Sequence, residues 1–499
     1  MIWPMRAMER LRMLTGGEPT LGMLLERLVP IHGDSRLVEE AGDGLRLTFA
    51  EGAARVDRMA AGIAAKIDPG DRVVLHVPNG YDLFLLCQAV CRAGGVAVPV
   101  NDKMRDNEIE HVVSDSGATL VVTAAEDVLA DEGLGNERAL TAGPDDVAGI
   151  FYTSGTTGLP KGARLSHLAL LGPAPKSAAL PVRFKRDVVT GMPVAHIAGF
   201  TILVTAVCAG LPVYLLRKFR PTDALDAIEE RRASAFIGVP AMYRMMEEAG
   251  AADRDLSSVR MWASGADAMP DDLVKKFQSF GSTATLPVVG FNLGDAVFID
   301  GYGMVELAGG VATRVSLPGF TLPLMPLPGY KMKAVDDDGN EVPVGQVGEL
   351  VVKGRGALKG YHGDDAASKA VISEDGWVRT GDLARRGPFG LMTLAGRKKH
   401  VIKHGGYSVF AVEVETQLGQ HPEVAEAAVI GLADDRKGEV PVAVVRLRNG
   451  ASLDEEALIA WAKQQMADYK VPTRVVFVDE LPRTGTDKVQ KDALKALFD

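Results

Sequence analysis

The chain has 499 residues, of which 47% are hydrophobic and 24% are charged, the balance of a globular protein. This length exceeds what one hydrophobic core supports, so two or more domains are expected. The formal net charge of -10 argues against a nucleic-acid partner, which would favour a basic surface. No apolar run has the length of a membrane span, and residues 1–14 lack the pattern of a secretory signal, which predicts a cytoplasmic protein.

Helices and short apolar strands alternate from residue 49 onward. Helical spacing at 49–66 and 83–92 flanks an apolar strand at 72–77. Further strands are predicted at 96–100, 120–123, 150–153, 188–192, 213–216 and 236–239. Parallel strands joined by helical crossovers produce this alternation. The pattern therefore predicts an α/β fold, with a large N-terminal domain of mostly parallel sheets and helices. Cys87 and Cys91, one helical turn apart, are expected to pack in its core.

The sequence becomes rich in glycine, proline and charge near residue 325. Short antiparallel strands are predicted there, with turns at Asp338-Gly339 and Val344-Gly345. An α+β pattern follows Gly396, and its last long helix is predicted to begin at a capping box, Ser452 to Glu455. We expect a large domain over 1–395, including a β-rich subdomain at 325–395, and a small mobile domain over 396–499.

The strongest chemical signal is the segment Thr153–Gly162, TSGTTGLPKG, directly after an apolar strand. Glycines let backbone N–H groups turn toward an anion, hydroxyl groups add donors, and Lys161 adds positive charge. This combination predicts a phosphate-binding loop. It is not a Walker A loop, because Pro160 precedes the lysine and Gly162 follows it.

This loop resembles the phosphate loop of the adenylate-forming superfamily, which comprises acyl-CoA synthetases, adenylation domains and firefly-type luciferases. Four later segments match the motifs of that superfamily in the same order. These are Asp300–Glu306 for its YGxTE motif, Gly376–Leu383 for TGD, Gly396–Lys403 for the hinge strand and Pro482–Lys488 for the terminal PRxxxGK loop. The resemblance extends from about residue 20 to the C-terminus, and it implies an AMP-forming acyl-CoA synthetase.

The resemblance also implies the reaction and its cosubstrates. A fatty or aryl carboxylic acid attacks ATP to form acyl-AMP, with Mg²⁺ as metal, and the acyl group then passes to the thiol of coenzyme A. An acyl carrier protein as the thiol donor, a second copy of the chain as a homodimer partner, and a nucleotide-binding homologue without turnover all remain open alternatives.

Individual roles come from the same resemblance. Lys488 is expected to contact the reacting carboxylate and the α-phosphate, His196 to border the acyl pocket, and Lys399 to be the hinge between the domains. Thr153 and Glu306 are the expected metal ligands. The expected cofactor-binding residues are Thr153, Ser154, Gly155, Thr156, Thr157, Gly158, Lys161, Gly265, Ala266, Gly301, Tyr302, Gly303, Glu306, Asp382, Arg397, Gly405 and Gly406.

Some positions depart from the family pattern. Val305 replaces a threonine of the YGxTE motif, and Asp487 replaces the glycine before Lys488. The stretch between Pro270 and Tyr302 is longer than in small acyl-CoA synthetases, which predicts either a reshaped pocket wall or a surface hairpin. The residues expected near the acyl group are mainly small or apolar, which favours an apolar acyl or aryl acid. They are Ile197, Ala198, Gly199, Phe200, Val239, Met242 and 263–267.

Overall fold

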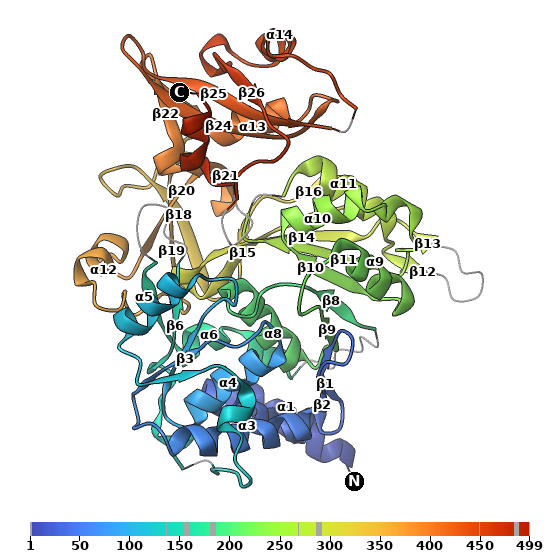
Figure 1. The fold of residues 1–499 in the computed structure, drawn as a ribbon, viewed down its shortest axis with the longest axis vertical. Coiled ribbons are helices and arrows are strands. Elements are labelled where there is room, and N and C mark those ends of the chain that lie inside the picture. Colours follow the sequence, from blue (N-terminus) through green and yellow to red (C-terminus); the bar gives the residue numbers. More distant parts are fainter. Residues whose placement is uncertain are drawn as a thin grey trace. The chain divides into compact units, whose positions relative to one another are not determined.

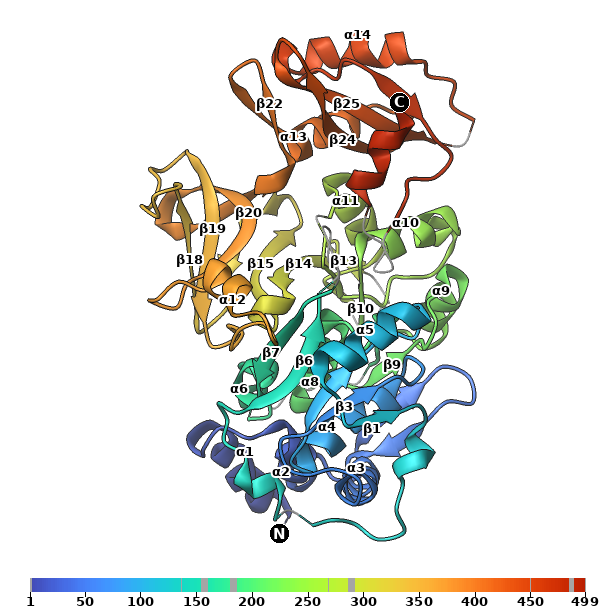
Figure 2. The same cartoon turned by 60° about the vertical axis from the view of Figure 1, so that its left-hand side comes forward.

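The computed structural model describes residues 2–135, 137–153, 160–179, 186–267, 269–285, 292–448, 450–483 and 489–498. The chain divides into two compact units (Figures 1 and 2). Unit 1 comprises the described residues of 1–153, 159–331 and 353–378, and unit 2 those of 332–352 and 379–499. Of the helices in this described part, none combines the length and the apolar content that crossing a membrane requires.

Unit 1 contains a five-stranded sheet in the order β5-β3-β4-β6-β7. Its strands are β3 (Arg72–Leu75), β4 (Val96–Pro99), β5 (Leu120–Val122), β6 (Val147–Tyr152) and β7 (Gly162–Ser166). Neighbouring strands are parallel except for the edge pair β6–β7. Helices α4 (Tyr81–Arg92) and α5 (Asp106–Ser116) contact this sheet, and α3 (Phe49–Ala64) packs against α4. Cys87 and Cys91 are buried in α4, as the sequence predicts.

The second large sheet of unit 1 has ten strands. Its order is β16-β15-β14-β11-β10-β8-β9-β1-β2, and β17 also pairs with β15. The strands are β1 (Arg36–Glu40), β2 (Arg46–Thr48), β8 (Val188–Thr190), β9 (Val213–Leu215), β10 (Ala235–Gly238), β11 (Met261–Gly265), β14 (Val297–Met304), β15 (Gly309–Leu317), β16 (Phe320–Thr321) and β17 (Met325–Pro326). The central strands from β14 to β1 are parallel, and the outer pairs are antiparallel. The predicted α/β class is thereby confirmed.

Unit 1 contains further helices. They are α1 (Ile2–Thr15), α2 (Leu24–His32), α6 (His167–Leu171), α7 (Ala174–Ser177), α8 (Ile197–Ala209), α9 (Pro221–Glu230), α10 (Pro240–Glu248), α11 (Asp271–Phe280) and α12 (Asp365–Val371). The long stretch after Pro270 contains α11 and then a hairpin. Its strands β12 (Ala284–Thr285) and β13 (Asn292–Leu293) pair antiparallel, and residues 286–291 between them lie outside the described residues.

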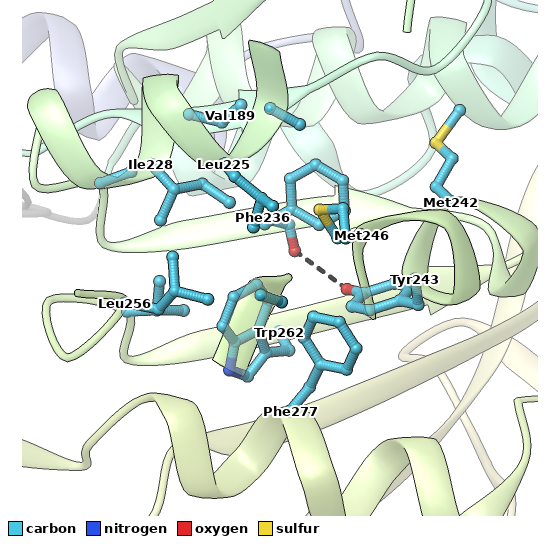
Figure 3. Close-up of a cluster of buried hydrophobic side chains, with 14 of the residues drawn as sticks. Val189, Leu225, Ile228, Phe236, Met242, Tyr243, Met246, Leu256, Trp262 and Phe277 are labelled. Atoms are coloured by element: carbon cyan, nitrogen blue, oxygen red, sulfur yellow. Dashed lines mark hydrogen bonds between the residues drawn. The ribbon is translucent and has the colours of Figure 1, made fainter. Parts of the chain in front are cut away.

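A dense aromatic cluster fixes one face of the ten-stranded sheet (Figure 3). Phe236, Trp262 and Phe298 share one row across β10, β11 and β14. Tyr243 of α10 packs on this row, and its hydroxyl donates to the carbonyl oxygens of Ala263 (2.7 Å) and Phe236 (3.4 Å). Edge-to-face contacts with Phe277 complete the cluster. Such close packing immobilises the strands whose carboxyl ends carry the predicted nucleotide residues.

Unit 2 holds most of a four-stranded sheet and all of a five-stranded one. The first has the order β18 (Tyr330–Val335), β19 (Val347–Gly354), β20 (Val378–Arg386) and β21 (Met392–Arg397). Turns occur at Gly339 and Gly345, both with positive φ, as predicted. The second sheet has the order β23 (Tyr407–Phe410), β22 (Val401–His404), β25 (Gly438–Leu447) and β24 (Val424–Asp434), with β26 (Val475–Phe477) beside β25.

The five-stranded sheet of unit 2 has a core on each face. Ala443 and Val445 of β25 pack with helices α13 (Ala411–Leu418) and α14 (Glu455–Gln465). Val442 and Val444 belong instead to a second cluster that includes Leu494. Because successive strand residues point to opposite faces, the apolar run at 442–445 requires cover on both sides.

The predicted start of α14 was wrong by two residues. The N-cap is Asp454, whose Oδ1 accepts a 2.8 Å hydrogen bond from the backbone N–H of Ala457. A carboxylate at the N-cap also interacts favourably with the positive end of the helix dipole, an advantage that the Ser452 hydroxyl lacks.

Candidate active site

The predicted phosphate loop connects the antiparallel strands β6 and β7. The backbone N–H of Thr153 donates a 2.9 Å hydrogen bond to the carbonyl oxygen of Lys161, and this bond ties the two ends of the loop together. Ring Nε2 of His111 lies 3.1 Å from the carbonyl oxygen of Pro160. The predicted phosphate-binding residues 154–158 lie outside the described residues. What the structure establishes is the position of the loop's ends, at the edge of a sheet.

Lys161 lies beside two residues that sequence reasoning did not identify. Its Nζ is 2.9 Å from Oδ2 of Asp364 and 5.6 Å from the ring centroid of Tyr361. The ammonium group therefore has a carboxylate on one side and an aromatic face on another. About two hundred residues of sequence separate Lys161 from both partners. No local pattern signals these contacts.

Glu306, the predicted metal ligand, is held by the same aromatic residue. The hydroxyl of Tyr361 donates a 2.8 Å hydrogen bond to Glu306 Oε1, and the backbone N–H of Leu358 donates to the Glu306 carbonyl oxygen at 2.9 Å. Burial, and next the nearby Glu306 carboxylate, raise the pKa of Tyr361 well above its usual range. Tyr361 thus stays a hydrogen-bond donor to Glu306 at any physiological pH.

The predicted adenine-binding segments meet where the parallel pairing of β11 with β14 ends. Gly265 and Gly301 are register partners in these parallel strands, so Ala266 and Tyr302 follow at the same edge. Gly303 is required by packing, because a Cβ there would lie 1.9 Å from the carbonyl oxygen of Gly309. Ligands of parallel sheets bind beyond the carboxyl ends of strands, so this placement suits nucleotide binding.

Ala266 adopts a backbone conformation that favours glycine, with φ of 70°. A non-glycine residue there costs on the order of 1–3 kcal/mol, and such strain is concentrated at functional sites. The neighbouring carboxyl group of Asp300 is also perturbed. Burial raises the pKa of Asp300 to about 6, although Arg314, at 3.2 Å, opposes the shift. Asp300 and Arg314 were not predicted as site residues.

His196 is the N-cap of α8. Its Nδ1 accepts a 3.3 Å hydrogen bond from the backbone N–H of Ala198, so the ring orientation is fixed by the helix that it begins. Gly199 permits a close backbone approach, because a Cβ would lie 2.1 Å from the carbonyl oxygen of Pro193. Among the residues predicted near the acyl group, Ile197, Phe200 and Met242 are buried, whereas Ala198 and Val239 are partly exposed.

Unit 2 brings the two predicted ribose-binding residues together. Asp382 of β20 and Arg397 of β21 are register partners, and Arg397 Nε lies 3.0 Å from Asp382 Oδ1. The preceding Gly381 has φ of 70°, a turn geometry that glycine adopts without strain. A carboxylate and a guanidinium side by side provide an acceptor and a donor for a diol.

The predicted hinge residue Lys399 follows a residue, Lys398, that makes two ion pairs. Lys398 Nζ lies 2.7 Å from Asp337 and 3.3 Å from Glu349, and Arg379 also contacts Glu349 at 2.7 Å. Glu349 belongs to β19 and its side chain is buried, so this pair links Lys398 to the four-stranded sheet immediately before Lys399. Residues 398–400 form a single helical turn, and β22 begins at Val401.

Gly405 and Gly406 form the turn between β22 and β23. Both have positive φ, 56° and 86°, and no atom would lie within 4 Å of an added Cβ at either position. Glycine is therefore required by backbone conformation, and the space next to the turn is open.

Lys488, the predicted catalytic lysine, lies outside the described residues. Lys491, the other lysine of that segment, is largely buried in a pair with the carboxylate of Glu415, and its Nζ also donates to the Val429 carbonyl oxygen at 3.3 Å. A lysine held in this way has a structural role.

Comparison with known proteins gives a family for this arrangement. The model described as AMP-binding enzyme matches residues 25–362, and the model of the AMP-binding enzyme C-terminal domain matches residues 413–488. The chain belongs to the AMP-binding enzyme family. The predicted adenylate-forming superfamily is thereby confirmed.

Several relatives match nearly the whole chain. A feruloyl-CoA synthase from Amycolatopsis sp. is 33% identical, with 91% of this chain and 94% of that protein covered. An indoleacetate–CoA ligase from Aromatoleum aromaticum is 32% identical, with 90% and 93% covered. The crystal structure of ATP-bound MatB from Rhodopseudomonas palustris superposes with a TM-score of 0.81 at 29% identity and covers 96% of this chain and 99% of MatB. These relationships confirm the predicted class of acid–thiol ligase.

Proposed function

We propose that this protein converts an aryl carboxylic acid into its coenzyme A thioester through an acyl-AMP intermediate, using ATP. The observation that carries the proposal is the near-complete alignment with CoA ligases whose named acids, ferulate and indoleacetate, are both aromatic. The chain is also 28% identical to the long-chain-fatty-acid–CoA ligase FadD13 from Mycobacterium tuberculosis, so a fatty acid is the second candidate substrate. ATP and coenzyme A are intracellular cosubstrates, so we place the reaction in the cytoplasm.

In the first half-reaction, a carboxylate oxygen attacks the α-phosphorus of ATP. A new P–O bond forms, the bond to the bridging oxygen of the β-phosphate breaks, and pyrophosphate leaves. We assign Lys161 and residues 154–158 to the phosphates, because charge develops there during the reaction. Lys488 neutralises charge at the carboxylate and α-phosphate, and His196 borders the acid.

We assign two sets of residues to the nucleoside, one for adenine in unit 1 and one for ribose in unit 2. We assign Tyr302 to stacking on adenine, with Gly265, Ala266, Gly301 and Gly303 forming its backbone surroundings. Asp382 accepts hydrogen bonds from the ribose hydroxyls, and Arg397 donates to them.

We propose that Glu306 contributes a carboxylate to a Mg²⁺ site. The described residues contain no group of three or more His, Cys, Asp and Glu side chains that could hold a metal. Nucleotide-bound Mg²⁺ needs only one or two protein carboxylates, because phosphate oxygens and water supply the other ligands. We therefore assign Glu306 and Thr153 to the metal, which when bound neutralises charge on the phosphates.

In the second half-reaction, the thiolate of coenzyme A attacks the acyl carbon, the C–S bond forms and AMP leaves. We assign the open turn at Gly405 and Gly406 to the passage of the pantetheine chain. The two half-reactions require different residues of the small domain, residues 396–499, and we propose Lys399 as the hinge. The pair of Lys398 with the buried Glu349 carboxylate supports this position, because it links the residue before Lys399 to the four-stranded sheet.

The experiment is an assay of pyrophosphate release with a panel of aryl and fatty acids, with and without coenzyme A. We expect aromatic acids to give the highest rates and a coenzyme A thioester as product. Acid-dependent pyrophosphate release that yields thioester only with an acyl carrier protein would support the carrier-loading alternative. No release with any acid would support a homologue without turnover.

A further inference from the structure

Residues 359–362 of unit 1 lie along β7 and form an isolated β-bridge with it, in which Tyr361 is opposite Ala163; residues 361–364 form the turn before helix α12. The backbone N–H of Lys359 donates to the carbonyl oxygen of Arg164 (2.8 Å). The N–H of Arg164 donates in turn to the carbonyl oxygen of Gly360 (3.0 Å). The N–H of His362 donates to the carbonyl oxygen of Gly162 (2.8 Å). The segment is thus fixed to the residues that directly follow Lys161.

In this position, the two carboxylate oxygens of Asp364 contact different groups. Oδ1 accepts a 2.8 Å hydrogen bond from the backbone N–H of Ala367 and so caps helix α12. Oδ2 lies 2.9 Å from Lys161 Nζ. The Ala367 N–H, followed by the Lys161 ammonium, lowers the pKa of Asp364, so the group is an anion at neutral pH.

The ion pair of Lys161 and Asp364 can be broken at low energetic cost. The Lys161 and Asp364 side chains are 50% and 39% exposed, so water screens their attraction. The pair of Lys491 and Glu415, by contrast, is 16% and 18% exposed. A lysine on a flexible four-carbon stem can leave one anion for another with little rearrangement.

We propose that Asp364 is an internal counter-ion, which pairs with Lys161 in the nucleotide-free enzyme. When a phosphate group binds, it displaces Asp364 from Lys161. The inference rests on the proposed role of Lys161 in phosphate binding. Carboxylate and phosphate oxygens compete for one ammonium group. The net affinity for phosphate is therefore reduced by the free energy needed to break the Lys161–Asp364 contact. The arrangement keeps the lysine positioned before the ligand arrives and reduces binding of stray anions.

The test is calorimetric binding of inorganic pyrophosphate to the full chain at low salt. Asp364→Asn removes the charge but keeps an oxygen that caps α12. Asp365→Asn is the matched control. It removes the same charge from the neighbouring residue, whose side chain is exposed. We expect Asp364→Asn to bind pyrophosphate about two- to fivefold more tightly than the control, the range for releasing an exposed ion pair. Equal or weaker binding would overturn the proposal.

Lys161→Met separates this inference from the proposed site. Greatly weakened pyrophosphate binding by Lys161→Met supports the assignment of Lys161, and the Asp364 comparison then decides the counter-ion alone. Unchanged binding by Lys161→Met would overturn both.

Discussion

The hydroxyl of Tyr361 donates a 2.8 Å hydrogen bond to Oε1 of Glu306, while Lys161 Nζ lies 5.6 Å from the centre of the same ring. One aromatic side chain thus contacts both the expected metal ligand and the expected phosphate ligand. Because Tyr361 is buried, with 7% of its surface exposed, it can hold the Glu306 carboxylate in one orientation. We infer that Tyr361 is a positioning residue for metal binding.

Replacing Tyr361 with phenylalanine should therefore weaken the metal-dependent part of nucleotide binding. A hydrogen bond to a charged group is worth about 1.5–3 kcal/mol, so the Mg²⁺ concentration needed for half-maximal ATP binding should rise about tenfold or more. ATP binding without Mg²⁺ is the internal control and should change little. Equal weakening with and without the metal would contradict this role.

The pair of Asp382 and Arg397 should determine affinity for the nucleoside. Changing either residue to alanine should raise the ATP concentration needed for half-maximal activity by about ten- to a hundredfold, with a smaller effect on the acid. Arg385→Ala, on the same strand as Asp382, is the control and should behave like the wild type. The ribose assignment fails if ATP requirements of the pair's variants match those of the control.

Lys488→Ala should slow acyl-AMP formation by about a hundredfold or more, the scale for losing one group that stabilises transition-state charge. Thioester formation from supplied acyl-adenylate should persist. Lys491→Ala is the matched control: it should lower the melting temperature, because Glu415 loses its partner, while acyl-AMP formation continues. Equal loss of both half-reactions in a folded Lys488 variant would argue against its role in adenylation.

If Lys399 is the hinge, a rigid residue there should impair thioester formation more than acyl-AMP formation, the reverse of the effect expected for Lys488→Ala. Lys399→Pro fixes φ at this residue and should slow transfer to coenzyme A more than acyl-AMP formation. Lys399→Ala removes the side chain but leaves the backbone free, so it should transfer at a rate closer to that of the wild type. Normal transfer by the proline variant would rule out rotation about this position.

The sequence was sufficient for features that depend on local pattern. Alternating apolar strands and helices predicted the parallel sheets, and the register of β20 and β21 places the predicted Asp382 and Arg397 side by side. Contacts between distant segments could not be predicted in this way. Tyr361 and Asp364 follow no periodic pattern, and their roles depend on the β-bridge between residues 359–362 and β7, which brings them to Glu306 and Lys161. The buried Asp300 likewise becomes notable only once the packing around it is known.

The most direct test of the central claim follows one oxygen atom. The enzyme is incubated with ATP, coenzyme A and an aryl acid whose carboxylate carries heavy oxygen, and the products are weighed by mass spectrometry. If a carboxylate oxygen attacks the α-phosphorus, one heavy oxygen appears in AMP and the other remains in the acyl thioester. Thioester formation with heavy oxygen in inorganic phosphate, and none in AMP, would contradict an acyl-AMP intermediate.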